Sequence, residues 1–155
     1  MTITSAICNS FKQEILVEGH NFTNGTDTFK ISLYSSDSAT LNKSTTAYTA
    51  PTDGTADPTN TYEVTSTSSG YTTGGNSLTS TTPVLSGDTA CCKFADTSWG
   101  SSASFTARGC LIYNSTNSNK AVCAINFGAD KTVTSGTFTI QFPAQTAGNA
   151  IIQIA

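Results

Sequence analysis

The stretch SFTARGCLIYNSTNSNKAVCAINF, residues 104–127, decides the fold, because two runs of alternating apolar residues flank a polar turn. The first run puts on one face the residues Phe105, Ala107, Gly109, Leu111 and Tyr113. The second run, after the Asn- and Ser-rich segment 114–119, repeats the alternation at Ala121, Cys123, Ile125 and Phe127. A period of two is typical of strands that bury one face, so this stretch predicts two strands of a sheet.

Further alternating runs lie on both sides of this stretch. They cover Phe29–Leu33, Phe138–Phe142 and the apolar C-terminal segment 150–155, and another strand is expected at 77–85. Turn-forming residues separate the later runs at 128–131 and 143–148, which gives a spacing of roughly ten residues. The chain also holds 29 Thr and 20 Ser among 155 residues, a composition that suits strands and turns. We therefore predict one all-β domain over 1–155, an antiparallel β-sandwich or open barrel.

One helix is expected, at the N-terminus over residues 4–18. At about 100° per residue, an apolar face forms from Ile7, Cys8, Phe11 and Ile15. Thr4 or Ser5 can cap its start, and Gly19 suits the left-handed position after its end. Because such a short helix is marginal alone, its apolar face must dock on the sheets or on a neighbouring subunit.

A polar segment separates the early strand from the later ones. Residues 50–76 are rich in Thr, Ser, Gly and Asp and hold few apolar side chains. We expect a long surface excursion there, with Tyr62 and Tyr71 as anchors to a partner.

Charge and hydropathy exclude several classes of partner. Only 11% of residues are charged, the net charge is −3, and no cluster of Lys and Arg occurs, which argues against nucleic acid or an anionic membrane. No apolar run reaches the roughly 20 residues of a membrane span. The N-terminus lacks a basic region and carries Lys12 and Glu14 inside its apolar stretch, so we expect no signal peptide and synthesis in a host cytoplasm. The five cysteines then remain free thiols.

Residues able to carry out catalysis or bind a metal are scarce. The single histidine, His20, follows Gly19 and is expected to cap the helix carbonyls. No serine sits in a Gly-x-Ser-x-Gly turn, and no two cysteines have the Cys-x-x-Cys spacing of a zinc site. Asp53 and Asp57 lie four residues apart but lack the other ligands of a calcium loop. The sequence predicts neither an enzyme nor a cofactor or metal site.

Trp99 and Arg108 are the remaining candidates for contact with a partner. With the five tyrosines, Trp99 could form a platform for a sugar ring, although a core position at a strand end is the favoured interpretation. Arg108, the only arginine, lies mid-strand, where it needs a carboxylate mate or an inter-subunit contact. With the helix face and the excursion, the candidate interface residues are Phe11, Ile15, Tyr62, Tyr71, Trp99 and Arg108.

Several segments together resemble a family of small virion structural proteins of tailed bacteriophages. They are CNSFKQE (8–14), GYTTGGN (70–76), FADTSW (94–99), TARGCLIYN (106–114), NKAVCAINFGADKT (119–132) and FTIQFP (138–143). The resemblance implies a place in the virion and carries no catalytic residues. The first hypothesis is a head decoration or cement protein that binds the major capsid protein as a small oligomer, most simply a trimer. A tail or fibre-associated protein is the second, a host-surface carbohydrate-binding module the third, and a hydrolase the last.

Overall fold

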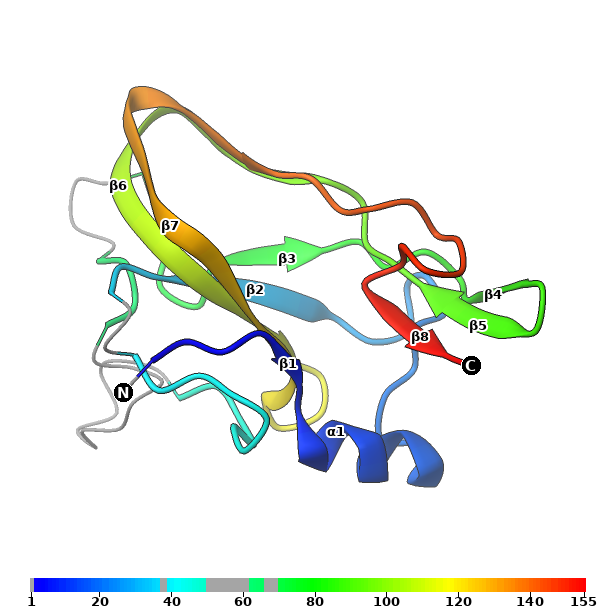
Figure 1. Cartoon of the computed structure of the whole chain (residues 1–155). Coiled ribbons are helices and arrows are strands. Elements are labelled where there is room, and N and C mark those ends of the chain that lie inside the picture. The colour runs from blue at the N-terminus through cyan, green and yellow to red at the C-terminus, as the bar shows by residue number, and fades with distance from the viewer. Residues whose placement is uncertain (1, 37–38, 50–61, 66–69) are drawn as a thin grey trace.

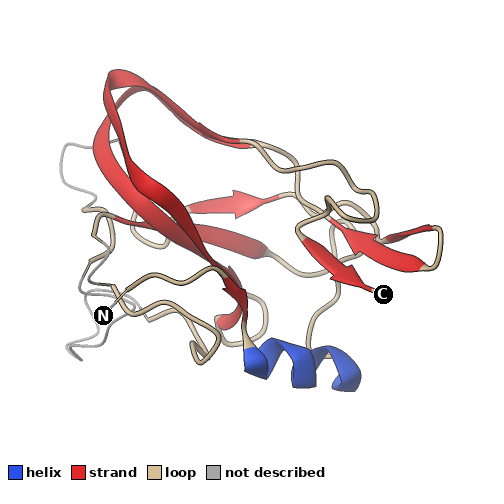
Figure 2. Ribbon diagram, in the orientation of Figure 1, coloured by secondary structure: helices blue, strands red, loops and turns tan. Residues whose placement is uncertain are grey.

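The computed structural model describes residues 2–36, 39–49, 62–65 and 70–155, and these residues form two open antiparallel sheets with one short helix (Figures 1 and 2). The larger sheet has the order β1-β7-β6-β2-β3. Its strands are β1 (Ala6–Ile7), β2 (Phe29–Tyr34), β3 (Asn76–Leu78), β6 (Thr97–Asn114) and β7 (Lys120–Ile140). The smaller sheet has the order β4-β5-β8, with β4 (Val84–Ser86), β5 (Thr89–Cys92) and β8 (Ile152–Ile154). The predicted all-β antiparallel fold with an N-terminal helix is confirmed.

The long β6–β7 hairpin dominates the fold. Its proximal half, next to the turn, consists of 109–114 and 120–126 and is flanked by β2 on one side and β1 on the other. Its distal half consists of 97–107 and 131–140, and within the described residues no third strand pairs with it. Figure 1 shows the hairpin rising from its turn near α1, bending, and running on toward the small sheet.

The bend occurs where the sequence predicted a turn. Ala107 pairs with Lys131 and Gly109 with Asn126, so residues 127–130 lie opposite Arg108 alone. This is a large β-bulge, which bends a strand without ending it. The two runs 121–127 and 138–142 therefore belong to one bent strand and its continuation, and the predicted turn between them at 128–131 is wrong.

The helix is shorter than predicted. It comprises α1 (Asn9–Glu14) and a 3-10 turn, η1 (Ile15–Val17), with Cys8 rather than Thr4 or Ser5 at the N-cap. The residues before it are extended, because β1 pairs with β7 and the Thr4 amide donates to the Leu41 carbonyl at 2.8 Å. These strand contacts outweigh the weak tendency of a short helix to extend.

The end of the helix also differs in one residue. Glu18, not Gly19, takes the left-handed conformation, with φ of 58°. Gly19 is required for another reason: a Cβ there would lie 2.8 Å from the Glu14 carbonyl oxygen.

The predicted surface excursion 50–76 lies partly in the core. Residues 50–61 and 66–69 are outside the described residues, but Glu63, Val64 and Tyr71 are buried. The Val64 amide donates to the Leu33 carbonyl at 2.9 Å, which extends the hydrogen bonding along β2. The described parts of this segment are therefore structural, and the interpretation as a pure excursion fails for them.

The end of the chain behaves as expected. Residues 152–154 pair with β5, which confirms that the apolar C-terminal segment is held in a sheet. The strand expected at 77–85 is instead divided between β3 and β4, with Leu78 in one sheet and Val84 in the other.

Candidate functional site

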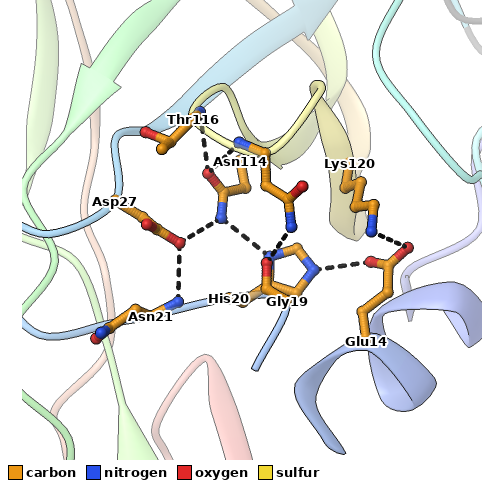
Figure 3. A network of polar contacts seen from close by, with 9 residues as sticks. Glu14, Gly19, His20, Asn21, Asp27, Asn114, Thr116 and Lys120 are labelled. Atoms are coloured by element: carbon orange, nitrogen blue, oxygen red, sulfur yellow. Dashed lines mark hydrogen bonds and ion pairs between the residues drawn. The ribbon is translucent and has the colours of Figure 1, made fainter. Parts of the chain in front are cut away.

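A polar network joins the helix, the loop before β2 and the turn of the long hairpin (Figure 3). His20 Nε2 lies 2.8 Å from Glu14 Oε2, and His20 Nδ1 lies 3.2 Å from Asn114 Nδ2. Asn114 Nδ2 also donates to Asp27 Oδ2 at 2.7 Å. At the rim, Lys120 Nζ lies 3.6 Å from Glu14 Oε1. Two parts of the chain that are distant in sequence, residues 14–27 and the hairpin turn at 114–120, are thus tied together.

The geometry fixes the role of His20. The Asn114 side-chain oxygen accepts the backbone amides of Thr116 and Asn117, so its nitrogen must face the histidine. His20 Nδ1 therefore accepts, and Nε2 carries the proton that it donates to Glu14. Both ring nitrogens are engaged within the fold, so His20 ties the helix end to the hairpin turn. The expected capping of helix carbonyls by His20 is replaced by this contact with the Glu14 carboxylate.

A second buried network surrounds Glu63. Its carboxylate accepts from Tyr48 Oη at 2.9 Å, Tyr71 Oη at 2.7 Å and the Gly74 amide at 2.6 Å. Burial raises the pKa of Glu63 above its ordinary value, against these hydrogen bonds, which lower it. Tyr113 Oη completes the group by donating to the Gly74 carbonyl at 2.8 Å. The cluster anchors the described parts of 62–76 to the sheet.

Three of the predicted interface residues lie in the core. Phe11, Tyr71 and Trp99 each expose 3% of their surface. Phe11 packs against His20 and Phe22, Tyr71 binds Glu63, and Trp99 contacts Tyr71, Phe105 and Phe138. The structure therefore does not support them as contact residues. Because Trp99 is buried, its ring is not available for a sugar platform. The alternative interpretation, a core position for Trp99, is the one observed.

The other three predicted residues keep some exposure. Ile15 is half-buried at the end of the helix, and Tyr62 is half-buried against the core. Arg108 Nη1 lies 3.6 Å from Asp130 Oδ1, so it has the carboxylate mate that the sequence predicted. Both partners are partly exposed, and a pair of this kind contributes little stability.

An exposed apolar surface, which the sequence analysis missed, lies where the helix end meets the small sheet. Among the described residues, the large apolar side chains that are exposed are Leu16, Val17, Val84, Leu85 and Ile154. Leu85 and Ile154 share one side of the small sheet, and together with Ile15, Leu16 and Val17 we call them the helix–sheet face; Val84, next to Leu85 in β4, points to the other side. Leu16, Val17 and Leu85 expose 83%, 71% and 75% of their surface. The signal was available, because Leu16 and Val17 fall outside the apolar helix face that the periodicity defines.

A groove connects the two sides of the helix–sheet face. It is lined by Ile15 and Phe22 on one side and by Ala90, Cys92, Ile152 and Ile154 on the other. Leu85, Ala90 and Ile154 lie in register across the three strands. A hollow of about 480 Å³ continues from it past His20, and Ile15, Phe22 and Pro83 line both. Exposed apolar side chains beside an apolar groove are typical of sites of protein–protein contact.

A separate apolar cleft opens inside the bend of the β6–β7 hairpin. It has a volume of about 470 Å³ and lies between the proximal half, at Cys110 and Ile125, and the distal half, at Phe138 and Ile140. Lys131 and Ile151 also line it. The sequence analysis missed the cleft because the bend that creates it was read as a turn.

Within the described ranges, no group of three or more His, Cys, Asp and Glu side chains is arranged to hold a metal ion. No helix in the described part of the chain has the length and apolar character of a membrane span. All five cysteines are free and buried.

Comparison with known proteins adds no assignment, since no family model, no curated protein and no solved structure matches this chain.

Proposed function

We propose that this chain is a structural subunit of a tailed-phage particle, a decoration or cement protein that binds the major capsid protein through its helix–sheet face. The observation that carries the proposal is the exposure of Leu16, Val17 and Leu85 next to one apolar groove: Leu16 and Val17 follow its lining residue Ile15 in η1, and Leu85 pairs with its lining residue Ala90. Side chains of this size, left in water, favour a protein partner over a soluble substrate. The virion itself is inferred from the sequence resemblance described above.

Three further features support a role in assembly. The two polar networks are used inside the fold, with His20 and Glu63 both fully engaged by neighbouring side chains. The surface is rich in hydroxyl groups and low in charge, so a neighbouring subunit can cover it without desolvating many ion pairs. A small symmetric oligomer, most simply a trimer, would present several helix–sheet faces at once and gain from multivalency.

Two charges placed on the helix–sheet face test the proposal. The variant Leu16→Glu/Leu85→Glu should fold normally, because both side chains are exposed, and should lower particle occupancy by more than about tenfold. The matched control is Thr134→Glu/Thr137→Glu on the exposed side of the distal hairpin. Equal occupancy of both variants, with unchanged thermal unfolding, would reject this face as the docking surface.

The alternative of a tail or fibre-associated protein uses the same face and differs in copy number. Hundreds of copies per particle support the decoration role, and a few to a few dozen support the tail. A carbohydrate-binding role is less favoured, because Trp99, Tyr34, Tyr48, Tyr71 and Tyr113 are all buried.

A further inference from the structure

The cleft inside the bent hairpin has the dimensions of a small-molecule site. Its volume of about 470 Å³ falls within the range of roughly 300–1,000 Å³ of ligand pockets. Since one water occupies about 30 Å³ in the liquid and a methylene group is of similar size, a chain of about ten carbons with its head group fits.

The lining is apolar along most of its length. Ile125, Phe127, Phe138 and Ile140 come from β7, and Phe142, two residues after its end, and Ile151 line the same space. Several of these side chains, among them Phe138, Ile140 and Ile151, remain half-exposed in the free chain. An apolar ligand would therefore bury surface that the fold alone leaves in water.

Addition of an extended peptide to the open edge of β7 is less favoured by the same residues. The edge is interrupted by the bulge at 127–130 and by Ser135, whose φ is 45°, and it carries Lys131. Bulges and lysines are the devices that protect sheet edges from pairing with another strand. The side chains of the cleft, and not its backbone, are the available binding groups.

One charged group lies among the described residues that line the cleft. It is Lys131, which directly follows the bulge at 127–130. The neighbouring Arg108 already faces the carboxylate of Asp130. The cleft thus combines a mostly apolar lining with a single cation, which complements an apolar chain that carries an anion.

We propose that this cleft binds a single-chain amphiphile with a carboxylate head group, the head at Lys131 and the chain along Phe138 and Ile140. This site is distinct from the helix–sheet face and does not depend on the proposed role in the particle.

Trp99 offers a direct readout, because it is the only tryptophan and its ring lies 5.8 Å from that of Phe138, which lines the cleft. Decanoate, below its micelle-forming concentration, should change Trp99 fluorescence saturably. Decan-1-ol should bind more weakly, and decyltrimethylammonium more weakly still. Absence of a saturable response to all three would overturn the site, and equal binding of all three would overturn the carboxylate head group.

Variants separate the head from the chain. Lys131→Glu should weaken decanoate roughly tenfold, because an attraction becomes a repulsion, whereas Lys43→Glu, on a distant exposed loop, should leave it unchanged. Ile140→Phe should weaken all three probes by filling the cleft. An unchanged decanoate affinity in Lys131→Glu, which is exposed and should fold, contradicts the proposal. The proposal is also contradicted if none of the three probes binds while Ile140→Phe prevents the chain from attaching to particles. That result would identify the cleft as a contact with another subunit.

Discussion

The two halves of the β6–β7 hairpin are made by the same two strands and yet differ in burial. In the proximal half, Leu111, Ile112, Ala121 and Val122 are completely buried; β1 and β2 flank this part of the sheet, and α1 contacts β7. In the distal half, Trp99 and Phe105 of β6 are buried, but the outward residues are exposed and Phe138 and Ile140 of β7 are only half-buried. A strand buried on both faces holds the fold together, whereas a ribbon buried on one face is left with surface for binding.

The largest difference between the halves should appear when the same side chain is removed from each. Ile112→Ala, at a site with no exposure, should cost about 2–5 kcal/mol, because it removes contacts and leaves a cavity. Ile140→Ala, in the open cleft, should cost about 1 kcal/mol or less. Chemical denaturation of both variants measures the difference. Equal losses would show that the distal half is as much a part of the core as the proximal half.

Added volume should distinguish the halves by a smaller amount. A Cβ at Gly109 would lie 2.5 Å from the Ile125 carbonyl oxygen, so Gly109→Ala should cost about 1–3 kcal/mol. A Cβ at Gly100, also in β6, would meet nothing within 4 Å. Gly100→Ala should therefore be neutral or slightly stabilising. If Gly109→Ala melts like the wild type, β6 and β7 are not held closely at the bend.

The Glu63 network should make stability depend on pH. Because burial raises the pKa of Glu63, the folded chain holds this proton more tightly than the unfolded chain, whose ordinary value is 4.5. The stabilising contribution is complete below that value and is lost as pH rises through the folded pKa. The slope is at most about 1.4 kcal/mol per pH unit. Unfolding free energies measured from pH 4 upward should show this slope in the wild type and not in Glu63→Gln; parallel curves would contradict it.

The smallest perturbation is thiol labelling, which reports opening of the proximal half without a mutation. Burial raises the pKa of Cys123 to about 12 and raises that of Cys110 in the same direction, so little thiolate forms at pH 8. Both should react with a thiol reagent only when the sheet opens, and all five cysteines should react after unfolding without reductant. Rapid labelling of Cys110 in the native protein would show that the proximal half opens readily.

The sequence predicted the strands well where the period of two was uninterrupted, as in β2 and the proximal hairpin. The prediction was wrong where the same local residues are compatible with two structures. Gly128 and Asp130 are turn formers, but here they form a bulge, because β6 continues on the other side and holds both arms of β7. Residues 4–8 have a helical period, yet pairing with β7 keeps them extended.

The candidate surfaces were less predictable than the strands. In the sequence, Trp99 and Tyr71 are candidates for contact with a partner. In the structure their rings pack against each other in the aromatic core, between the distal hairpin and the loop at residue 70. No local pattern in the sequence indicates the buried network of Glu63, because its partners Tyr48 and Tyr71 come from separate segments. Leu16 and Val17 could have been found, because they lie off the buried face of the helix.

The most direct test of the proposed role is a density map of the intact particle in which this chain is traced. The account predicts that the chain occurs in hundreds of copies on the head, with Leu16, Val17 and Leu85 buried against the major capsid protein. A map in which the chain is absent from the particle, or in which the helix–sheet face points to solvent while another surface makes the contact, would contradict it.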